Sequence, residues 1–434
     1  MVSKNIINKH EKEKFYLKGN IISIFPTNDQ KEIILKYMKL SRMIYNWGIE
    51  TQESLYKSFI NNNRTGIRIY HESELLMLLK DTIKSNPKYY CLKELPWHIA
   101  SITISHVIDA YEKFFDDRFR NGHPRFKNSN FYYMRFGFRN DNCYIIDGKL
   151  KVEGFKHGDF IDIKTHMFDG FGRSSKGYIS DKKILMYQPT ISFDGDNFHF
   201  SFSYFKEKEY FTIPKTEVIG IDLGNRNTFT LSTGEVFHQP DCSSEEKIIS
   251  SLDRRINEMN LNRIKKMNEL GIYIPKNTIQ LKLEKRRREK YRDIHNKKFY
   301  FYHNITTNIV RRNPTAICIE KIGVEDMQKE YPYLKDIIAE TYYFNIRKMF
   351  EYKCNKHGIL LLEANENYPS SKICSNCGFK YDKLGSKHTF KCPYCKCIID
   401  RDLNASINLR DLYDQYIKGD FSNISFDWIN GIGF

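Results

Sequence analysis

The chain has 434 residues, and its 69 Lys and Arg exceed its 53 Asp and Glu, which gives a net charge of +16. This length exceeds what one hydrophobic core supports, so about two to four domains are expected. The charge, with 29 Tyr and 31 Phe, suits a partner with phosphates to neutralise and bases to stack on. A soluble basic protein with solvated faces is the alternative. The sequence has no apolar run long enough for a membrane-spanning helix and no signal-peptide core at its start, so we expect no membrane partner and a cytoplasmic location.

The first half of the chain changes from a strand to helices and back to strands. Residues 14–25 are rich in β-branched and aromatic side chains, which predicts a strand. Thr27, three residues before a Gln, gives a capping-box pattern that starts a helix, and a second strong helix is predicted over 97–118. Between about 131 and 211, apolar and polar residues alternate, which indicates a β-barrel or sandwich. If the first strand joins it, the helices form an insertion in a β-domain.

Two basic stretches are candidate contacts for a nucleic-acid backbone. Residues 118–127 alternate basic and aromatic side chains around Gly and Pro, a composition that can hold and stack on nucleic acid. Residues 244–313 predict two long polar helices broken near Gly271, and the second carries a dense cationic stripe suited to phosphates. A solvated surface helix is the alternative for that stripe. The candidate residues are Arg118, Arg120, Arg125, Lys127, Lys282, Arg286, Arg287 and Arg288.

Two Cys-x-x-Cys pairs near the end of the chain have the spacing of a zinc ribbon, because each pair presents two thiolates to one tetrahedral ion. The pairs are Cys374 with Cys377 and Cys392 with Cys395. A disulfide framework would need an oxidising compartment. Four thiolates close the coordination shell, so we assign the zinc to folding and not to catalysis. Cys397 and His388 are near enough in sequence to replace one of the four ligands.

Three carboxylates stand at the ends of predicted elements. Asp222 ends a short apolar run, Glu320 ends a second buried strand, and Asp402 opens the last predicted helix. Acids converging from separate elements would repel one another unless cations lay between them. Two divalent ions meet this need and catalyse phosphodiester hydrolysis, and oxygen ligands favour Mg²⁺ or Mn²⁺ over zinc. The pattern is that of a ribonuclease-H-type nuclease.

These motifs, in this order, resemble the TnpB (OrfB-type) family of transposon-encoded proteins, whose relatives are the miniature type V CRISPR effectors. Two departures are Cys397, where the family usually has Gly, and Ser406, where a second Ala is common. The resemblance covers nearly the whole chain. The matching segments are 25–30, 45–47, 122–127, 220–224, 319–322, 369–378 and 400–405.

The resemblance implies an RNA-guided, metal-dependent DNA endonuclease with a RuvC-like domain. Its catalytic triad falls on Asp222, Glu320 and Asp402, which would hold two Mg²⁺ ions. The nearby Asp400 is not the catalytic Asp of the motif. The implied partners are a guide RNA and double-stranded target DNA with its displaced strand, cut next to a short adjacent motif. The chain would act as a monomer or homodimer on the guide, associated with the nucleoid of a prokaryotic cell. The alternatives are a nuclease-inactive guided repressor and a transposase acting on transposon ends.

The expected fold is a multidomain α+β protein. It combines an RNase H-like (RuvC) α/β domain, which carries a zinc ribbon insert, with a β-barrel that carries a helical insertion. The expected divisions are 1–28 for the first barrel strand, 29–130 for the helical recognition insert, 131–214 for the wedge-like barrel, 215–368 for the nuclease domain with its basic insert 244–313, 369–398 for the ribbon, 399–418 for the last nuclease helix and 419–434 for a tail.

Overall fold

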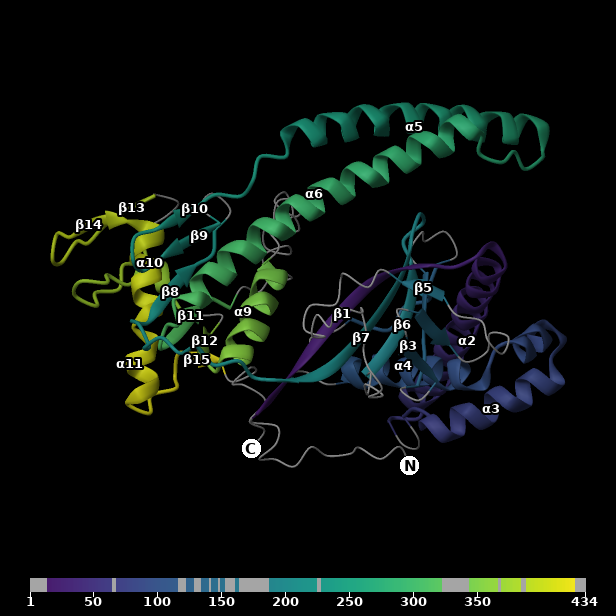
Figure 1. Ribbon diagram of the computed structural model, residues 1–434, viewed down its shortest axis with the longest axis horizontal. Coiled ribbons are helices and arrows are strands. Elements are labelled where there is room, and N and C mark those ends of the chain that lie inside the picture. Colours follow the sequence, from purple (N-terminus) through teal and green to yellow (C-terminus); the bar gives the residue numbers. More distant parts are fainter. Residues whose placement is uncertain are drawn as a thin grey trace. The chain divides into compact units, whose positions relative to one another are not determined.

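The protein has a mixed α/β fold in two compact units (Figure 1). We call Leu17–Lys206 the N-terminal unit, and Glu207–Phe434, which groups with the first sixteen residues, the C-terminal unit. The computed structural model describes residues 14–64, 68–115, 122–128, 134–139, 142–146, 149–152, 161–163, 187–224, 228–321, 343–365, 368–383 and 388–425. No helix within these ranges is both long enough and apolar enough to span a bilayer.

A seven-stranded sheet organises the N-terminal unit. Its strand order is β2-β6-β7-β1-β5-β4-β3, so the predicted first strand does join the later ones, and the helices are an insertion after it. Closure of this sheet into a barrel stays a prediction. The strands are β1 (Phe15–Phe25), β2 (Met134–Gly137), β3 (Cys143–Ile146), β4 (Lys149–Val152), β5 (Ile161–Ile163), β6 (Tyr187–Phe193) and β7 (Phe198–Glu207).

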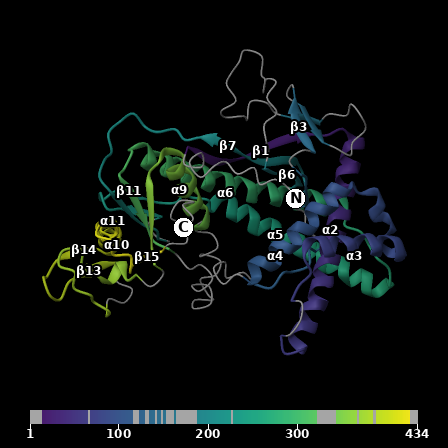
Figure 2. The same ribbon diagram turned by 90° about the horizontal axis from the view of Figure 1, so that it is seen from below.

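The inserted helices lie together (Figure 2) and share one core with the sheet. The predicted capping box starts α2: the Thr27 hydroxyl accepts from the Gln30 backbone N–H, and the Gln30 side chain accepts from that of Thr27. The 3₁₀ helix η1 was not predicted. The helices are α2 (Asn28–Asn61), α3 (Glu72–Ser85), η1 (Pro87–Glu94) and α4 (Trp97–Phe115). The basic end of the predicted 97–118 helix lies outside the described residues.

A six-stranded sheet organises the C-terminal unit, in the order β10-β9-β8-β11-β12-β15. Strands β8, β11 and β12 are parallel, while β9 pairs antiparallel with β8, β10 with β9, and β15 with β12. The short strand β15 was not predicted from the sequence. The strands are β8 (Ile219–Asp222), β9 (Phe229–Leu231), β10 (Val236–Phe237), β11 (Ala316–Ile319), β12 (Leu360–Ala364) and β15 (Ile424–Ser425).

Helices cover both faces of this sheet (Figure 1). One face packs in a core with α6 and α9, and the other packs against α10 and α11. The two long helices predicted around Gly271 form a hairpin, α5 and α6, that runs side by side in Figure 1, and Gly271 ends α5 in the left-handed conformation. The helices are α5 (Ser243–Leu270), α6 (Thr278–Arg311), α9 (Tyr343–His357), α10 (Arg401–Arg410) and α11 (Leu412–Ile417).

The start of the last helix differs from the prediction. Asp400, and not Asp402, is the N-cap of α10: its carboxylate accepts from the backbone N–H groups of Asp402 at 2.9 Å and Leu403 at 3.1 Å. A cap residue lies just outside the helix and satisfies its first donors. Asp402 therefore lies in the first turn, where its side chain is not needed for capping.

Candidate functional site

Two of the three predicted acids leave the sheet at the same edge. Strand β8 ends at Asp222 and β11 ends just before Glu320, and the register pairs Ile221 with Ile319 in parallel. Because side chains alternate along a strand, Asp222 and Glu320 lie on the face opposite to Ile221 and Ile319. That pair belongs to the core shared with α6 and α9. The two acids consequently share the α10 face of the sheet.

Helix α10 brings the third acid to this edge. Asp402 lies in its first turn, and α10 packs directly on β8. The contact is close because β8 has Gly220 there: a Cβ at Gly220 would lie 2.0 Å from the Ser406 carbonyl oxygen. The structure thus places Asp222 within electrostatic range of both Glu320 and Asp402.

Asp222 is buried, while Glu320 and Asp402 are half-buried. Burial raises the pKa of Asp222 well above its usual range, and the charges of Glu320 and Asp402 raise it further. Burial also raises the pKa of Glu320 to about 7, against the opposing charge of Arg401. A cation among these carboxylates would remove the repulsion.

The donors at this edge fit a hard divalent cation. Carboxylate oxygens are the ligands that Mg²⁺ and Mn²⁺ prefer. Thr230 pairs with Asp222 across β8 and β9, and its hydroxyl oxygen is buried without a hydrogen-bond partner among the described residues. Buried polar atoms normally have partners, so this hydroxyl is available to a water or ligand in the site.

The four predicted cysteines form one cluster. The Sγ atoms of Cys374, Cys377, Cys392 and Cys395 all lie within 4.8 Å of one another. The Sγ–Sγ distance is 3.6 Å for Cys374 with Cys395 and 3.7 Å for Cys377 with Cys392. Tetrahedral zinc with bonds of about 2.3 Å places its sulfurs about 3.8 Å apart, so the cluster fits zinc. In the described part of the chain, Cys397 and His388 do not join it.

Two asparagines of α10 tie this cluster to the helix that carries Asp402. The buried Asn404 side chain accepts from the Ser375 N–H at 2.9 Å and donates to the Ile373 carbonyl at 2.6 Å. Asn408 donates to the same Ile373 carbonyl and to that of Ser370, both at 2.7 Å. Figure 2 shows β13 (Thr389–Lys391) and β14 (Ile398–Asp400) of the ribbon beside α10. The first cysteine knuckle and Asp402 are therefore held by one helix.

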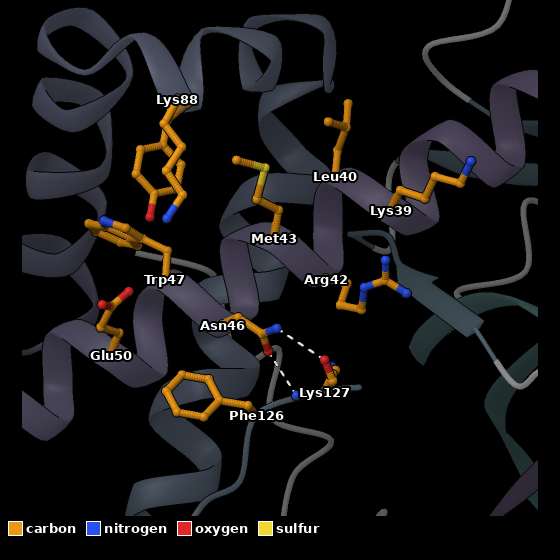
Figure 3. A pocket seen from close by; sticks show the side chains of 11 residues that line it. Lys39, Leu40, Arg42, Met43, Asn46, Trp47, Glu50, Lys88, Phe126 and Lys127 are labelled. Carbon is orange, nitrogen blue, oxygen red and sulfur yellow. Dashed lines mark hydrogen bonds between the residues drawn. The ribbon is translucent and has the colours of Figure 1, made fainter. Parts of the chain in front are cut away.

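The predicted basic loop is only partly described. Arg118 and Arg120 lie outside the described residues, and Arg125 is exposed. Lys127 is held in place, because its backbone N–H donates to Asn46 at 2.8 Å and its carbonyl accepts from Asn46 at 3.0 Å (Figure 3). Lys127 lines a pocket of about 590 Å³ whose walls are both basic and aromatic. Its other lining residues include Lys39, Arg42, Trp47, Lys88 and Phe126.

The predicted cationic stripe on α6 is partly neutralised within the helix hairpin. Arg287 donates to Asp253 of α5 at 2.8 Å, so it also holds α5 to α6. Lys282 and Arg286 are exposed, and Arg288 is half-buried. Their contact with nucleic acid stays a prediction.

Sequence reasoning missed several polar residues beside Lys127. His106, Asp109 and Lys113 of α4, together with Arg135 of β2, line a second pocket with it. The signal was present, since the three α4 residues are spaced three and four apart and therefore share one helix face. The buried apolar residues of this helix, such as Ile104 and Val107, lie on its other face.

Two family models match parts of this chain. The model of the Cas12f1-like TNB domain matches residues 343–409, and a helix-turn-helix domain model matches residues 18–60. TnpB-like protein L770 of Acanthamoeba polyphaga mimivirus is 22% identical over 422 residues, which cover 93% of this chain and 75% of that protein. The resemblance to the TnpB family is confirmed.

Two further matches bear on activity and fold. A Streptomyces pristinaespiralis protein named "Putative RNA-guided DNA endonuclease" is 29% identical over 199 residues, and the match spans 45% of this chain and only 44% of that protein. A cryo-EM structure of a Cas12f1–sgRNA–target DNA complex matches with a TM-score of 0.50 at 16% identity, covering 88% of this chain and 83% of that one. This TnpB-related chain therefore shares its multidomain α/β fold with Cas12f1.

Proposed function

We propose that the protein is an RNA-guided DNA endonuclease whose catalytic residues are Asp222, Glu320 and Asp402. The observation that carries the proposal is their convergence at one sheet edge, where burial and the charges of Glu320 and Asp402 raise the pKa of Asp222. The Streptomyces relative named for this activity supports it. In the C-terminal sheet, β9 and β10 lie antiparallel on one side of the three parallel strands and β15 lies antiparallel on the other, and this order supports an RNase H-like (RuvC) assignment.

In this proposal, the two strands and α10 hold the catalytic groups for phosphodiester hydrolysis. Bound Mg²⁺ ions would supply an activated water and stabilise the leaving oxygen. Asp222 and Glu320 supply oxygen ligands from the sheet, and Asp402 supplies one from the helix. The charge of Arg401 opposes the raised pKa values of Asp222 and Glu320 in part, which favours the ionised form that binds cations. The Thr230 hydroxyl offers a hydrogen bond to a water in the site.

The remaining parts of the chain then have supporting roles. Zinc on the four cysteines would fix the first knuckle, and Asn404 and Asn408 would transmit that order to α10 and to Asp402. The N-terminal unit would be the wedge and recognition parts, with the predicted divisions at residues 28, 130 and 214. It would hold the guide RNA and read the motif adjacent to the target, while base pairing reads the sequence.

The test compares two neighbouring acids in the same ribonucleoprotein. The protein is purified with transcripts from its native flanks, the bound RNA is sequenced, and matched duplex DNA is added with Mg²⁺. We expect Asp222→Asn, Glu320→Gln and Asp402→Asn each to abolish cutting. Asp400→Asn is the matched control, because Asn also caps helices and the cap on α10 is kept.

Each result has a distinct meaning. Cutting by Asp222→Asn or Glu320→Gln at the parent rate would overturn the assignment of the triad. Equal loss of cutting in Asp400→Asn and Asp402→Asn would remove the reason for choosing Asp402. Bound RNA with protected, uncut DNA in the parent would indicate a guided repressor. Absence of bound RNA would favour a transposase acting on transposon ends.

A further inference from the structure

A cationic cavity lies within the N-terminal unit, away from the proposed triad in sequence. Its volume is about 360 Å³. Three elements contribute cations to it: Lys113 comes from α4, Lys127 from residues 122–128, and Arg135 from β2. Among the described lining residues, Asp109 is the single carboxylate. We call this space the Lys127 cavity.

Lys127 is held in a fixed position in this cavity and is not a freely moving surface lysine. Its backbone is clamped on both sides by Asn46 (Figure 3), and its ammonium lies 3.6 Å from the centre of the Tyr45 ring. Such a cation–π contact orients the charge without neutralising it. The position of the ammonium is therefore set before any ligand arrives.

The cavity carries more positive charge than its own acids offset. No described carboxylate lies within ion-pair distance of Lys127 or Arg135. Burial, followed by the charge of Arg135, lowers the pKa of Lys127 to about 8. Burial, with the charges of Lys127 and Arg135, likewise lowers the pKa of His106, and Asp109 opposes this only in part. Lys127 is half-buried, and Lys113 and Arg135 are exposed at the same cavity. Cations gathered in this way repel one another, and an anion in the cavity would offset that repulsion.

We propose that the Lys127 cavity binds a phosphodiester group of a nucleic-acid backbone, with Lys113, Lys127 and Arg135 as its ligands. Arg and Lys are the residues that bind phosphate oxygens through charge-assisted hydrogen bonds. The neighbouring 590 Å³ pocket shares Lys127 and presents the exposed ring of Phe126, while Trp47 at its wall is buried in the core (Figure 3). A strand held at the cavity would meet aromatic surface beside it, where bases stack. This inference rests on the proposed function, which supplies the nucleic acid.

The first test needs no mutation and uses the full-length protein. Limited acetylation at pH 8 followed by mass spectrometry reports the reactivity of Lys127, with the exposed Lys84 of α3 as the internal reference. Saturation with a mixed-sequence RNA or duplex DNA should lower labelling of Lys127 relative to Lys84. The expected fall is roughly tenfold for each unit by which a bound phosphate raises the pKa of Lys127. Unchanged labelling with both nucleic acids would overturn the proposal.

A second arm separates the possible sources of the phosphate. Inorganic phosphate at equal ionic strength should protect Lys127 only weakly, because it lacks the stacking and the further contacts of a strand. Strong protection by inorganic phosphate, with none by either nucleic acid, would make this a small-anion site and refute the proposal. Protection by RNA alone or by DNA alone supports it and tells which strand occupies the cavity.

The third arm measures the salt dependence of nucleic-acid binding. Lys127→Gln and Arg135→Gln should each lower the slope of log affinity against log salt by about one, because each removes one phosphate contact. Lys84→Gln should leave the slope at the parent value. Thermal unfolding shows whether the variants fold, and the acetylation test stands if either does not. Parent slopes in both folded variants would refute the proposal.

These tests are independent of cutting. Protection of Lys127 in a protein that cuts no DNA would overturn the proposed function and leave the phosphate site standing. Guided cutting without protection of Lys127 would support the proposed function and overturn the phosphate site. In the labelling assay, nucleic acid should protect Lys127 in the Asp222→Asn variant as it does in the parent, because the substitution lies in the C-terminal unit.

Discussion

Replacing Gly220 with alanine tests the packing that places Asp402 beside Asp222. A Cβ at this position would lie 2.0 Å from the Ser406 carbonyl oxygen and 2.4 Å from the Arg410 backbone nitrogen. Real Cβ contacts essentially never fall below 3.0 Å, so α10 must move from β8 by about 1 Å. Both atoms belong to the helix backbone, and no side-chain rotation can relieve the overlap.

The displacement has consequences for stability and for activity. Overpacking of this kind costs about 1–3 kcal/mol in the free energy of unfolding. Asp402 lies four residues before Ser406, about one helical turn away, so a shift of the helix carries its carboxylate with it. A catalytic group misplaced by about 1 Å can cost roughly a hundredfold in rate. We therefore expect Gly220→Ala to slow guided cutting by about that factor, even when folded and saturated with Mg²⁺.

The measurements are single-turnover cleavage and urea unfolding of the parent and two glycine variants. Gly19→Ala is the matched control, because a Cβ there would meet only the Ser203 hydroxyl, at 3.9 Å. It should unfold and cut as the parent does. If Gly220→Ala also matches the parent in both assays, the close approach of α10 to β8 does not set the geometry of the site.

Three further predictions concern the metal sites and their supports. Cys374→Ser and Cys392→Ser should each release zinc and destabilise the C-terminal unit, and one zinc per chain in both variants, by elemental analysis, would contradict the ligand set. Asn404→Ala should lower the free energy of unfolding by about 1–3 kcal/mol, because it leaves the Ser375 N–H unpaired and leaves the Ile373 carbonyl with the bond from Asn408 alone; a urea midpoint equal to the parent's would show that other contacts hold the knuckle. In metal-free protein, the raised pKa of Glu320 should lower the free energy of unfolding by up to about 3 kcal/mol as the pH rises from 4.5 through 7. Glu320→Gln should flatten this pH dependence. An unchanged pH dependence in that variant would mean that other groups cause it.

The sign of the pH effect follows from which state binds more protons. Between the unfolded pKa of Glu320 near 4.5 and its folded pKa of about 7, the folded protein holds the proton more tightly. The contribution of protonated Glu320 to the free energy of unfolding is therefore fully present below pH 4.5 and is lost as the pH rises through 7. A divalent cation should reverse the loss at neutral pH, because it binds the ionised carboxylates of the folded site.

Local patterns in the sequence predicted the parts of the site that depend on near neighbours. The Cys-x-x-Cys spacing predicted the cysteine cluster, because two residues between thiols define one knuckle. The Thr27 capping box predicted the start of α2, because the cap and its partner are three residues apart. The apolar runs before Asp222 and Glu320 predicted two strands, of which β8 ends at Asp222 and β11 ends one residue before Glu320. Each of these features is complete within a few residues.

Tertiary structure decided what depends on residues far apart in the chain. Asp400 and Asp402 look equivalent in sequence, and only the start of α10 shows that the first is a cap. The sequence does not show why residue 220 is a glycine, and only the packing of α10 against β8 gives the reason. Lys113 and Arg135 become neighbours of Lys127 only because α4, β2 and residues 122–128 line one cavity. Side-chain periodicity encodes which face of an element is buried, but the partner that covers the face is chosen when the whole chain packs.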